Sequence, residues 1–182
     1  VKVPIELVGL CTLGGFLIPF LLSALIRILM GTNGRYFILL PFTIAFLSDA
    51  GAYFVGLRLG RHKLAPIVSP HKTVEGAVGG VLGSMAAGCV LTLVYSLLSA
   101  KYNVISIQVQ PKHYLVLLGM GAVASVLGIL GDLFASAVKR QAGIKDYGTI
   151  FPGHGGILDR FDSVMFIAPF VSIAVRYFFY LL

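Results

Sequence analysis

Long apolar segments alternate with short polar ones along the whole chain. Five of the apolar segments are long enough, at about 1.5 Å per helical residue, to cross roughly 30 Å of hydrocarbon. They lie at 5–29, 36–57, 76–99, 114–138 and 161–182. Because isolated spans in lipid must satisfy their own backbone hydrogen bonds, each is predicted to be a helix. The pattern predicts an all-α protein, a polytopic membrane helical bundle with about five transmembrane helices.

Composition agrees with a membrane protein. Of the 182 residues, 58% are hydrophobic and 12% are charged, whereas soluble domains are about a quarter charged. One helical unit accommodates a chain of this length, so we expect a single integral membrane domain over 1–182. The net charge of +7 is typical of loops that face an anionic cytoplasmic leaflet, or of a protein with a polyanionic substrate.

Cations concentrate in two of the polar segments between the spans. Loop 58–75 and loop 139–160 each hold four of them: Arg58, Arg61, Lys63 and Lys72 in the first, and Lys139, Arg140, Lys145 and Arg160 in the second. Two spans separate these loops, so both should lie on one side of the membrane. The positive-inside rule assigns that side to the cytoplasm.

Small residues recur near the start of the third span. Gly76 and Gly80, and likewise Gly79 and Gly83, are four residues apart, a spacing that lets two helix backbones approach closely. Packing between helices is the simplest interpretation. Spans of this kind are also compatible with a homodimer.

Four aspartates are expected at one depth, in the cytoplasmic half of the membrane or at its edge: Asp49, Asp132, Asp159 and Asp162. Because carboxylates in hydrocarbon are costly, such residues indicate a functional site with a cavity or a cationic partner. The alternative is an internal network of ion pairs, Asp132 with Arg140 or Asp159 with Lys139.

One helix face carries Asp132, Ser136, Lys139 and Arg140, which are four, seven and eight residues apart. Carboxylates from different helices beside several cations suggest a hard divalent cation with a phosphorylated ligand. Mg²⁺ fits this arrangement, since it takes one or two carboxylates and leaves its other positions to water and phosphate oxygens.

Two loop segments offer further candidate groups. His154 lies in PGHGG, where glycine N–H groups could bind an anion, although a lone histidine is more often a structural hydrogen-bonding residue. Lys72 and Thr73 precede a helix start and could bind a phosphate. The alternative for that segment is a solvated loop with Thr73 as a helix cap.

The segment 136–162 resembles the motif of the phosphatidate cytidylyltransferase family, also called CDP-diacylglycerol synthases. The matching residues are Ser136, Lys139, Arg140, Lys145, Asp146, Gly148, Pro152, His154, Gly155, Gly156, Asp159, Arg160, Phe161 and Asp162. SDAGAYFVG (48–56) and SPHKTVEGAVGG (69–80) look like two further blocks of that family. Because its members usually carry additional N-terminal membrane helices, the resemblance implies that 1–182 is the C-terminal, catalytic part of the family architecture.

The resemblance implies transfer of CMP from CTP to phosphatidate, giving CDP-diacylglycerol and pyrophosphate, with Mg²⁺ as cofactor and in some members a monovalent cation such as K⁺. It implies a polar active-site cavity facing the cytoplasm of a bacterial inner membrane, and no nucleic acid partner. Asp132 and Asp159 would bind the metal. Lys139, Arg140 and Lys145 would contact phosphate, and Ser136, His154 and Asp162 would belong to the same site. Together with the polar residues described above, this predicts a catalytic set of Asp132, Ser136, Lys139, Arg140, Lys145, His154 and Asp159, and a substrate-binding set of Asp49, Lys72, Thr73, Asp146, Arg160 and Asp162.

Two other functions compete with this interpretation. A CTP-dependent polyprenol or phytol kinase resembles the family in fold, but the complete motif favours the cytidylyltransferase. An ion-coupled transporter would also carry intramembrane aspartates, but usually near the midplane and often within inverted repeats. The chain has no such repeat.

Overall fold

The structure is a computed structural model that describes residues 5–31, 33–102, 110–148 and 155–179. It is almost entirely helical, which confirms the predicted all-α class. Its helices are α1 (Ile5–Thr12), the π-helical η1 (Leu13–Leu17), α2 (Ile18–Leu29), α3 (Gly34–Phe37), α4 (Leu39–Leu59), α5 (Val74–Tyr102), α6 (Pro111–Gln141), α7 (Leu158–Phe161), α8 (Val164–Ala174) and the π-helical η2 (Val175–Phe179).

Four helical stretches in the described part are long and apolar enough to cross a membrane: Leu7–Leu29, Gly34–Leu59, Val74–Leu98 and Pro111–Gln141. They correspond to the first four expected spans, and the chain is an integral membrane protein. The fifth expected span is shorter in the described residues, where its apolar helix runs over Val164–Tyr177. It begins later than expected because Leu158–Phe161 forms a separate single turn, α7.

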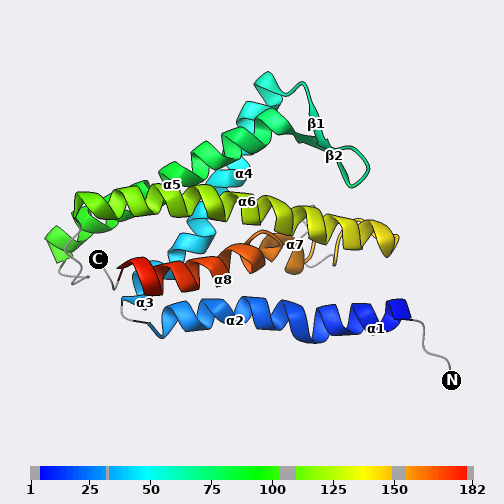
Figure 1. Cartoon of the computed structure of the whole chain (residues 1–182), viewed down its shortest axis with the longest axis horizontal. Helices are drawn as coiled ribbons and strands as arrows, with labels where there is room; N and C mark the ends of the chain where they lie inside the picture. Colours follow the sequence, from blue (N-terminus) through cyan, green and yellow to red (C-terminus); the bar gives the residue numbers. More distant parts are fainter. Residues whose placement is uncertain (1–4, 32, 103–109, 149–154, 180–182) are drawn as a thin grey trace.

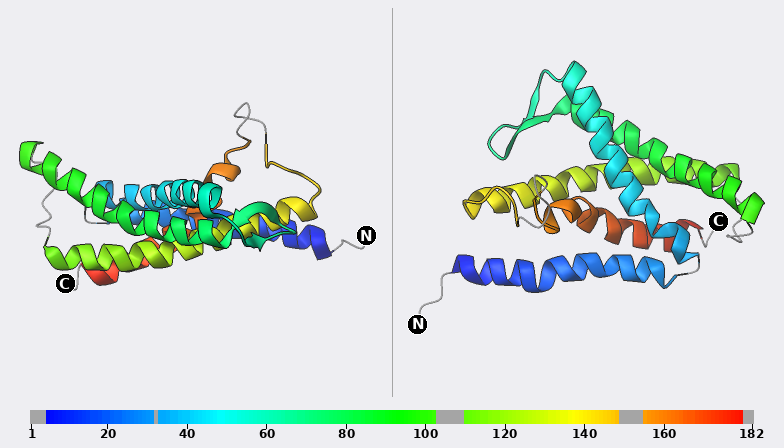
Figure 2. Two further views of the ribbon diagram at one scale, coloured as in Figure 1. Left: turned by 90° about the horizontal axis from the view of Figure 1, so that it is seen from above. Right: turned by 180° about the vertical axis from the view of Figure 1, so that it is seen from behind.

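The long helices lie side by side, with α8 between α2 and α6 and with α4 crossing the bundle to pair with α5 (Figures 1 and 2). The best buried side chains lie where these helices meet, and they include Leu40, Ile44, Leu117, Ile167 and Val171. Large apolar side chains also cover the outside of the spans, as expected of surfaces that contact lipid. The described parts of the two cation-rich segments lie at the same end of the bundle as the start of α1 (Figure 1), which agrees with the predicted number of crossings between them.

Helices α4 and α5 touch backbone to backbone. A Cβ atom placed on Gly51 would lie 2.4 Å from the carbonyl oxygen of Gly79, and one on Gly83 would lie 2.4 Å from that of Leu47. Only glycine fits at such distances, which confirms the close packing predicted from the glycine spacing. The contact holds Asp49 of α4 at a fixed position beside the start of α5.

A short antiparallel hairpin connects α4 to α5, where only a polar loop was predicted. It consists of β1 (Lys63–Ala65) and β2 (Ser69–Thr73). With so few residues, and with prolines at 66 and 70 that argue against a strand, the sequence offers no recognisable alternation. Glu75 fixes the base of the hairpin by accepting hydrogen bonds from the backbone N–H groups of Arg61 (3.1 Å) and His62 (3.2 Å).

Candidate functional site

A cavity of about 540 Å³ lies between α4, the hairpin, the start of α5 and the middle of α6. Its wall includes four of the predicted site residues: Asp49, Lys72, Thr73 and Asp132. These residues come from three elements, α4, β2 and α6, and the fold brings them to one cavity. The rest of the wall is mostly apolar or glycine, with Ala52, Leu57 and Ile129 among its members, and it also includes Lys63 and His71 of the hairpin.

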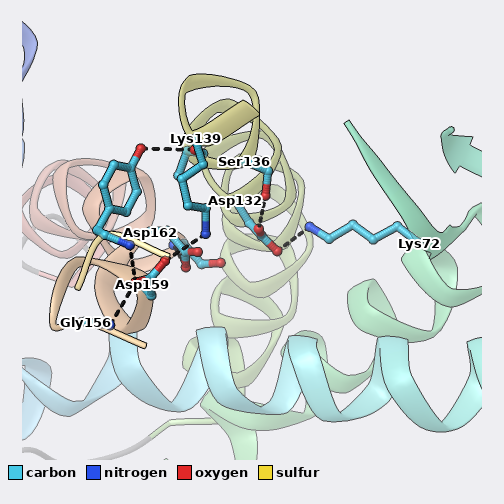
Figure 3. Close-up of polar contacts among 10 residues, drawn as sticks. Lys72, Asp132, Ser136, Lys139, Gly156, Asp159 and Asp162 are labelled. Atoms are coloured by element: carbon cyan, nitrogen blue, oxygen red, sulfur yellow. Dashed lines mark hydrogen bonds and ion pairs between the residues drawn. The ribbon is translucent and has the colours of Figure 1, made fainter. Parts of the chain in front are cut away.

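Asp132 is the polar centre of this side of α6. One of its carboxylate oxygens is paired with the ammonium group of Lys72 on β2, and the other accepts a hydrogen bond from the Ser136 hydroxyl at 3.2 Å (Figure 3). Ser136 lies one turn further along α6, as the helical spacing predicted. The ion pair considered from the sequence was Asp132 with Arg140, whereas the observed partner is Lys72.

Asp159 forms a second polar centre, on the other side of α6 (Figure 3). Its Oδ1 accepts a hydrogen bond from Lys139 Nζ at 2.8 Å, and its Oδ2 accepts from the backbone N–H groups of Tyr147 at 2.8 Å and Gly156 at 2.9 Å. Burial alone would raise the pKa of this carboxyl, but the Lys139 ammonium and the two N–H groups outweigh it and hold the pKa below its usual value. Asp159 is therefore a fixed anion.

Tyr147 supports this centre and was not predicted. Its hydroxyl donates a hydrogen bond to the carbonyl oxygen of Ala135 at 3.0 Å, and its ring centroid lies 5.4 Å from Lys139 Nζ. Burial, together with the charges of Asp159 and Asp162, raises the pKa of its hydroxyl. Only its position next to Asp146 in the motif could have singled it out, because its contribution to Asp159 is a backbone N–H that any residue provides.

Three carboxylates from separate elements lie close enough to repel one another: Asp49, Asp132 and Asp162. Asp162 follows α7, and one of its carboxylate oxygens accepts a hydrogen bond from the Ser163 N–H at 2.7 Å. The four aspartates predicted to share a level therefore belong to one polar region around α6. The excess of negative charge there favours a cation.

The remaining predicted residues lie at the edge of the site or outside it. Arg140, Lys145, Asp146 and Arg160 are exposed on α6, α7 and the loop after α6. The Thr73 hydroxyl accepts a hydrogen bond from the Gly76 N–H at 3.1 Å, as a helix cap does. His154 lies outside the described residues.

The donor set suits a hard divalent cation such as Mg²⁺, since it consists of carboxylate and hydroxyl oxygens. In the described part of the chain no three His, Cys, Asp or Glu side chains gather as a ready metal-binding group. Asp132 and Asp159 also each hold an ammonium group. A metal at these residues would thus compete with Lys72 and Lys139 for the same oxygens.

We expect Gly155→Ala to destabilise the protein by about 1–3 kcal/mol, the usual cost of a strained backbone. Gly155 has a φ of +82°, and an added Cβ would lie 3.0 Å from Asp159 Oδ2. Gly143→Ala is the matched control, because Gly143 also has a positive φ (+69°) but no atom within 4 Å of an added Cβ. Thermal unfolding in detergent should show the larger loss for Gly155→Ala. Equal losses would mean that crowding of Asp159 is unimportant.

Comparison with known proteins identifies relatives that match most of the chain. A sequence model of the cytidylyltransferase family matches residues 2–178. A phosphatidate cytidylyltransferase of Staphylococcus aureus (strain COL) is 44% identical over 142 residues, which are 78% of this chain and 50% of that protein. One from Staphylococcus saprophyticus is 42% identical over the same coverage. The chain thus spans about half the length of the curated relatives it matches.

Proposed function

This chain belongs to the cytidylyltransferase family, and we propose that it transfers CMP from CTP to phosphatidate, releasing pyrophosphate and forming CDP-diacylglycerol for phospholipid synthesis. The observation that carries the proposal is the pair of lysine–aspartate contacts on either side of α6, Lys72 with Asp132 and Lys139 with Asp159. Both lysines come from segments that resemble the family, and both would supply cations to two polyanionic substrates.

In this reaction an oxygen of the phosphatidate phosphate forms a bond to the α-phosphorus of CTP, and the bond from that phosphorus to the bridging oxygen of pyrophosphate breaks. The nucleophile is already ionised, so no general base is required. The main barrier is repulsion between anions, which cations at fixed positions reduce. Lys72 and Lys139 would serve as such cations, because their carboxylate partners hold them in place before substrate binds.

Mg²⁺ is the proposed cofactor, with Asp132 and Asp159 as its protein ligands and K⁺ as an optional second cation. When bound, Mg²⁺ would neutralise phosphate charge on CTP and on the leaving pyrophosphate. Ser136 and the N–H groups of Tyr147 and Gly156 would keep the two carboxylates oriented.

We further propose that the site faces the cytoplasm of a bacterial inner membrane. The cation-rich loops support this orientation by the positive-inside rule, and CTP is available on that side. Phosphatidate would come from the surrounding lipid, so both a water-soluble and a lipid substrate can reach the cavity. The glycines at the start of α5 pack against α4 of the same chain, so they do not supply a surface for the homodimer considered from the sequence.

The test is to follow the label of CTP into lipid, with phosphatidate in mixed micelles and with Mg²⁺ or EDTA. Label in the α-phosphate of CTP should enter the lipid in a Mg²⁺-dependent manner, whereas label in the γ-phosphate should be released as pyrophosphate. The chain is assayed alone and joined to the part of the Staphylococcus aureus relative that it does not cover. Transfer of γ-label to a lipid alcohol would instead identify a CTP-dependent kinase, and no transfer of either label by the joined protein would refute the proposal.

A further inference from the structure

The tip of the β1–β2 hairpin is apolar and exposed. The turn between the strands is Pro66-Ile67-Val68, and Ile67 is 94% exposed, more than any other large hydrophobic side chain in the described residues. Turns usually carry Gly, Asn, Asp or Ser because these residues suit both water and tight backbone geometry. An exposed isoleucine at such a turn therefore indicates a contact with something apolar outside the chain.

Cations lie on the same hairpin, nearer its base. Arg58, Arg61 and Lys63 are exposed at the base of the hairpin and along β1, and His71 is exposed on β2. Lys63 and His71 also line the cavity. Among the described residues, the side chains of Arg58, Arg61 and Lys63 make no ion pair with an aspartate or glutamate. An apolar residue flanked by unpaired cations is the pattern of a segment that lies in the interface of an anionic membrane.

The hairpin is also located at the right depth. It joins the ends of two membrane-spanning helices, at Leu59 of α4 and Val74 of α5, so its base is at the bilayer surface. It leans sideways from the bundle, and along the long axis of the molecule it stops short of the ends of α1 and α6 (Figures 1 and 2). A hairpin that does not pass the ends of its neighbouring spans remains beside lipid headgroups.

We propose that this hairpin is a lipid-binding element, in which Ile67 inserts at the boundary between headgroups and acyl chains while Arg58, Arg61 and Lys63 bind anionic phospholipid headgroups. The partner is the bilayer that contains the protein. Strand β2, which begins at the tip, carries Lys72, whose ammonium group pairs with Asp132 in the cavity. Lipid contact at the tip thus stabilises the strand that presents a cation to the site. The proposal does not depend on the reaction proposed above.

The test uses the absence of tryptophan from the chain. Ile67→Trp places a single fluorophore at the tip, and the protein is reconstituted into vesicles of phosphatidylcholine and phosphatidylglycerol. Since the side chain of Ile67 is almost fully exposed, the substitution removes few contacts within the protein. Ile144→Trp is the control, because Ile144 is also an exposed apolar residue outside the spans, in the loop that follows α6.

Two quenchers separate the outcomes. Trp fluorescence of the Ile67→Trp protein should be quenched at least twofold more by lipids brominated near the headgroup than that of the Ile144→Trp protein, and it should be protected from the neutral aqueous quencher acrylamide. Replacing Arg58, Arg61 and Lys63 together by Gln should reduce the bromolipid quenching. The proposal is overturned if both tryptophans respond alike, or if the tip is fully accessible to acrylamide. It is also overturned if the tip is shielded from both quenchers, as it would be beneath a protein partner.

Discussion

Asp132→Asn is expected to lower the rate of the proposed CMP transfer about 10²- to 10³-fold, the usual loss when one electrostatic group of a preorganised site is removed. Asp132 contacts both the Lys72 ammonium and the Ser136 hydroxyl, and it is one of the two proposed metal ligands. The amide keeps the shape of the side chain but removes its charge. Initial rates at saturating CTP, measured over a range of Mg²⁺ concentrations, would report the loss.

A double variant separates catalysis from structure. Asp132→Asn alone leaves the partly buried ammonium of Lys72 without its counter-ion, so thermal stability should fall. Adding Lys72→Met removes that isolated charge, and we expect stability to recover while CMP transfer stays low. Recovery of activity in the double variant would mean that Asp132 only balances a charge, and the metal proposal would then be wrong.

Gly51→Ala is expected to destabilise the protein by about 1–3 kcal/mol or more, the range for overpacking of a tight contact. The added Cβ would lie 2.4 Å from the Gly79 carbonyl oxygen, which is backbone and cannot rotate away. Helix α4 would have to move away from α5, and Asp49 would move with it. We therefore expect the midpoint of heat-induced aggregation in detergent to fall and CTP binding to weaken together.

Gly119→Ala is the control for this effect. Gly119 also lies inside a span, on α6, but no atom lies within 4 Å of an added Cβ. Since alanine is a better helix former than glycine, stability should stay the same or rise. Similar destabilisation by both substitutions would show that helix propensity or lipid exposure, and not the α4–α5 contact, determines the outcome.

Hydropathy predicted the membrane spans because lipid imposes a simple rule on every residue of a span. The contact between Gly51 and Gly79 was predicted in part. The spacing of Gly79 and Gly83 indicated that α5 packs closely against another helix, but it did not identify Gly51 as the partner. The hairpin was missed because its strands are only a few residues long and contain proline. Local sequence patterns thus predicted the membrane-spanning helices, whose residues all meet the same lipid environment, but not the hairpin.

The contacts of the site were harder to predict because they join distant parts of the chain. Lys72 and Asp132 are 60 residues apart in sequence, and nothing local distinguishes this pairing from Asp132 with Arg140. Lys139 with Asp159 was foreseen as a structural alternative, and the pair does form. The N–H groups of Tyr147 and Gly156 bind Asp159 through the backbone, which carries no side-chain signature.

The pairing of Lys72 with Asp132 has a consequence for the way the protein is made. Chains leave the ribosome from the N-terminus, so α4, the hairpin and α5 enter the membrane before α6. Lys72 then waits at the bilayer surface, where a cation is tolerated. When α6 is inserted beside α5, Asp132 meets a counter-ion that is already in place, and the carboxylate need not remain unpaired in hydrocarbon. The order of synthesis therefore helps a helix with a buried acid to enter the membrane.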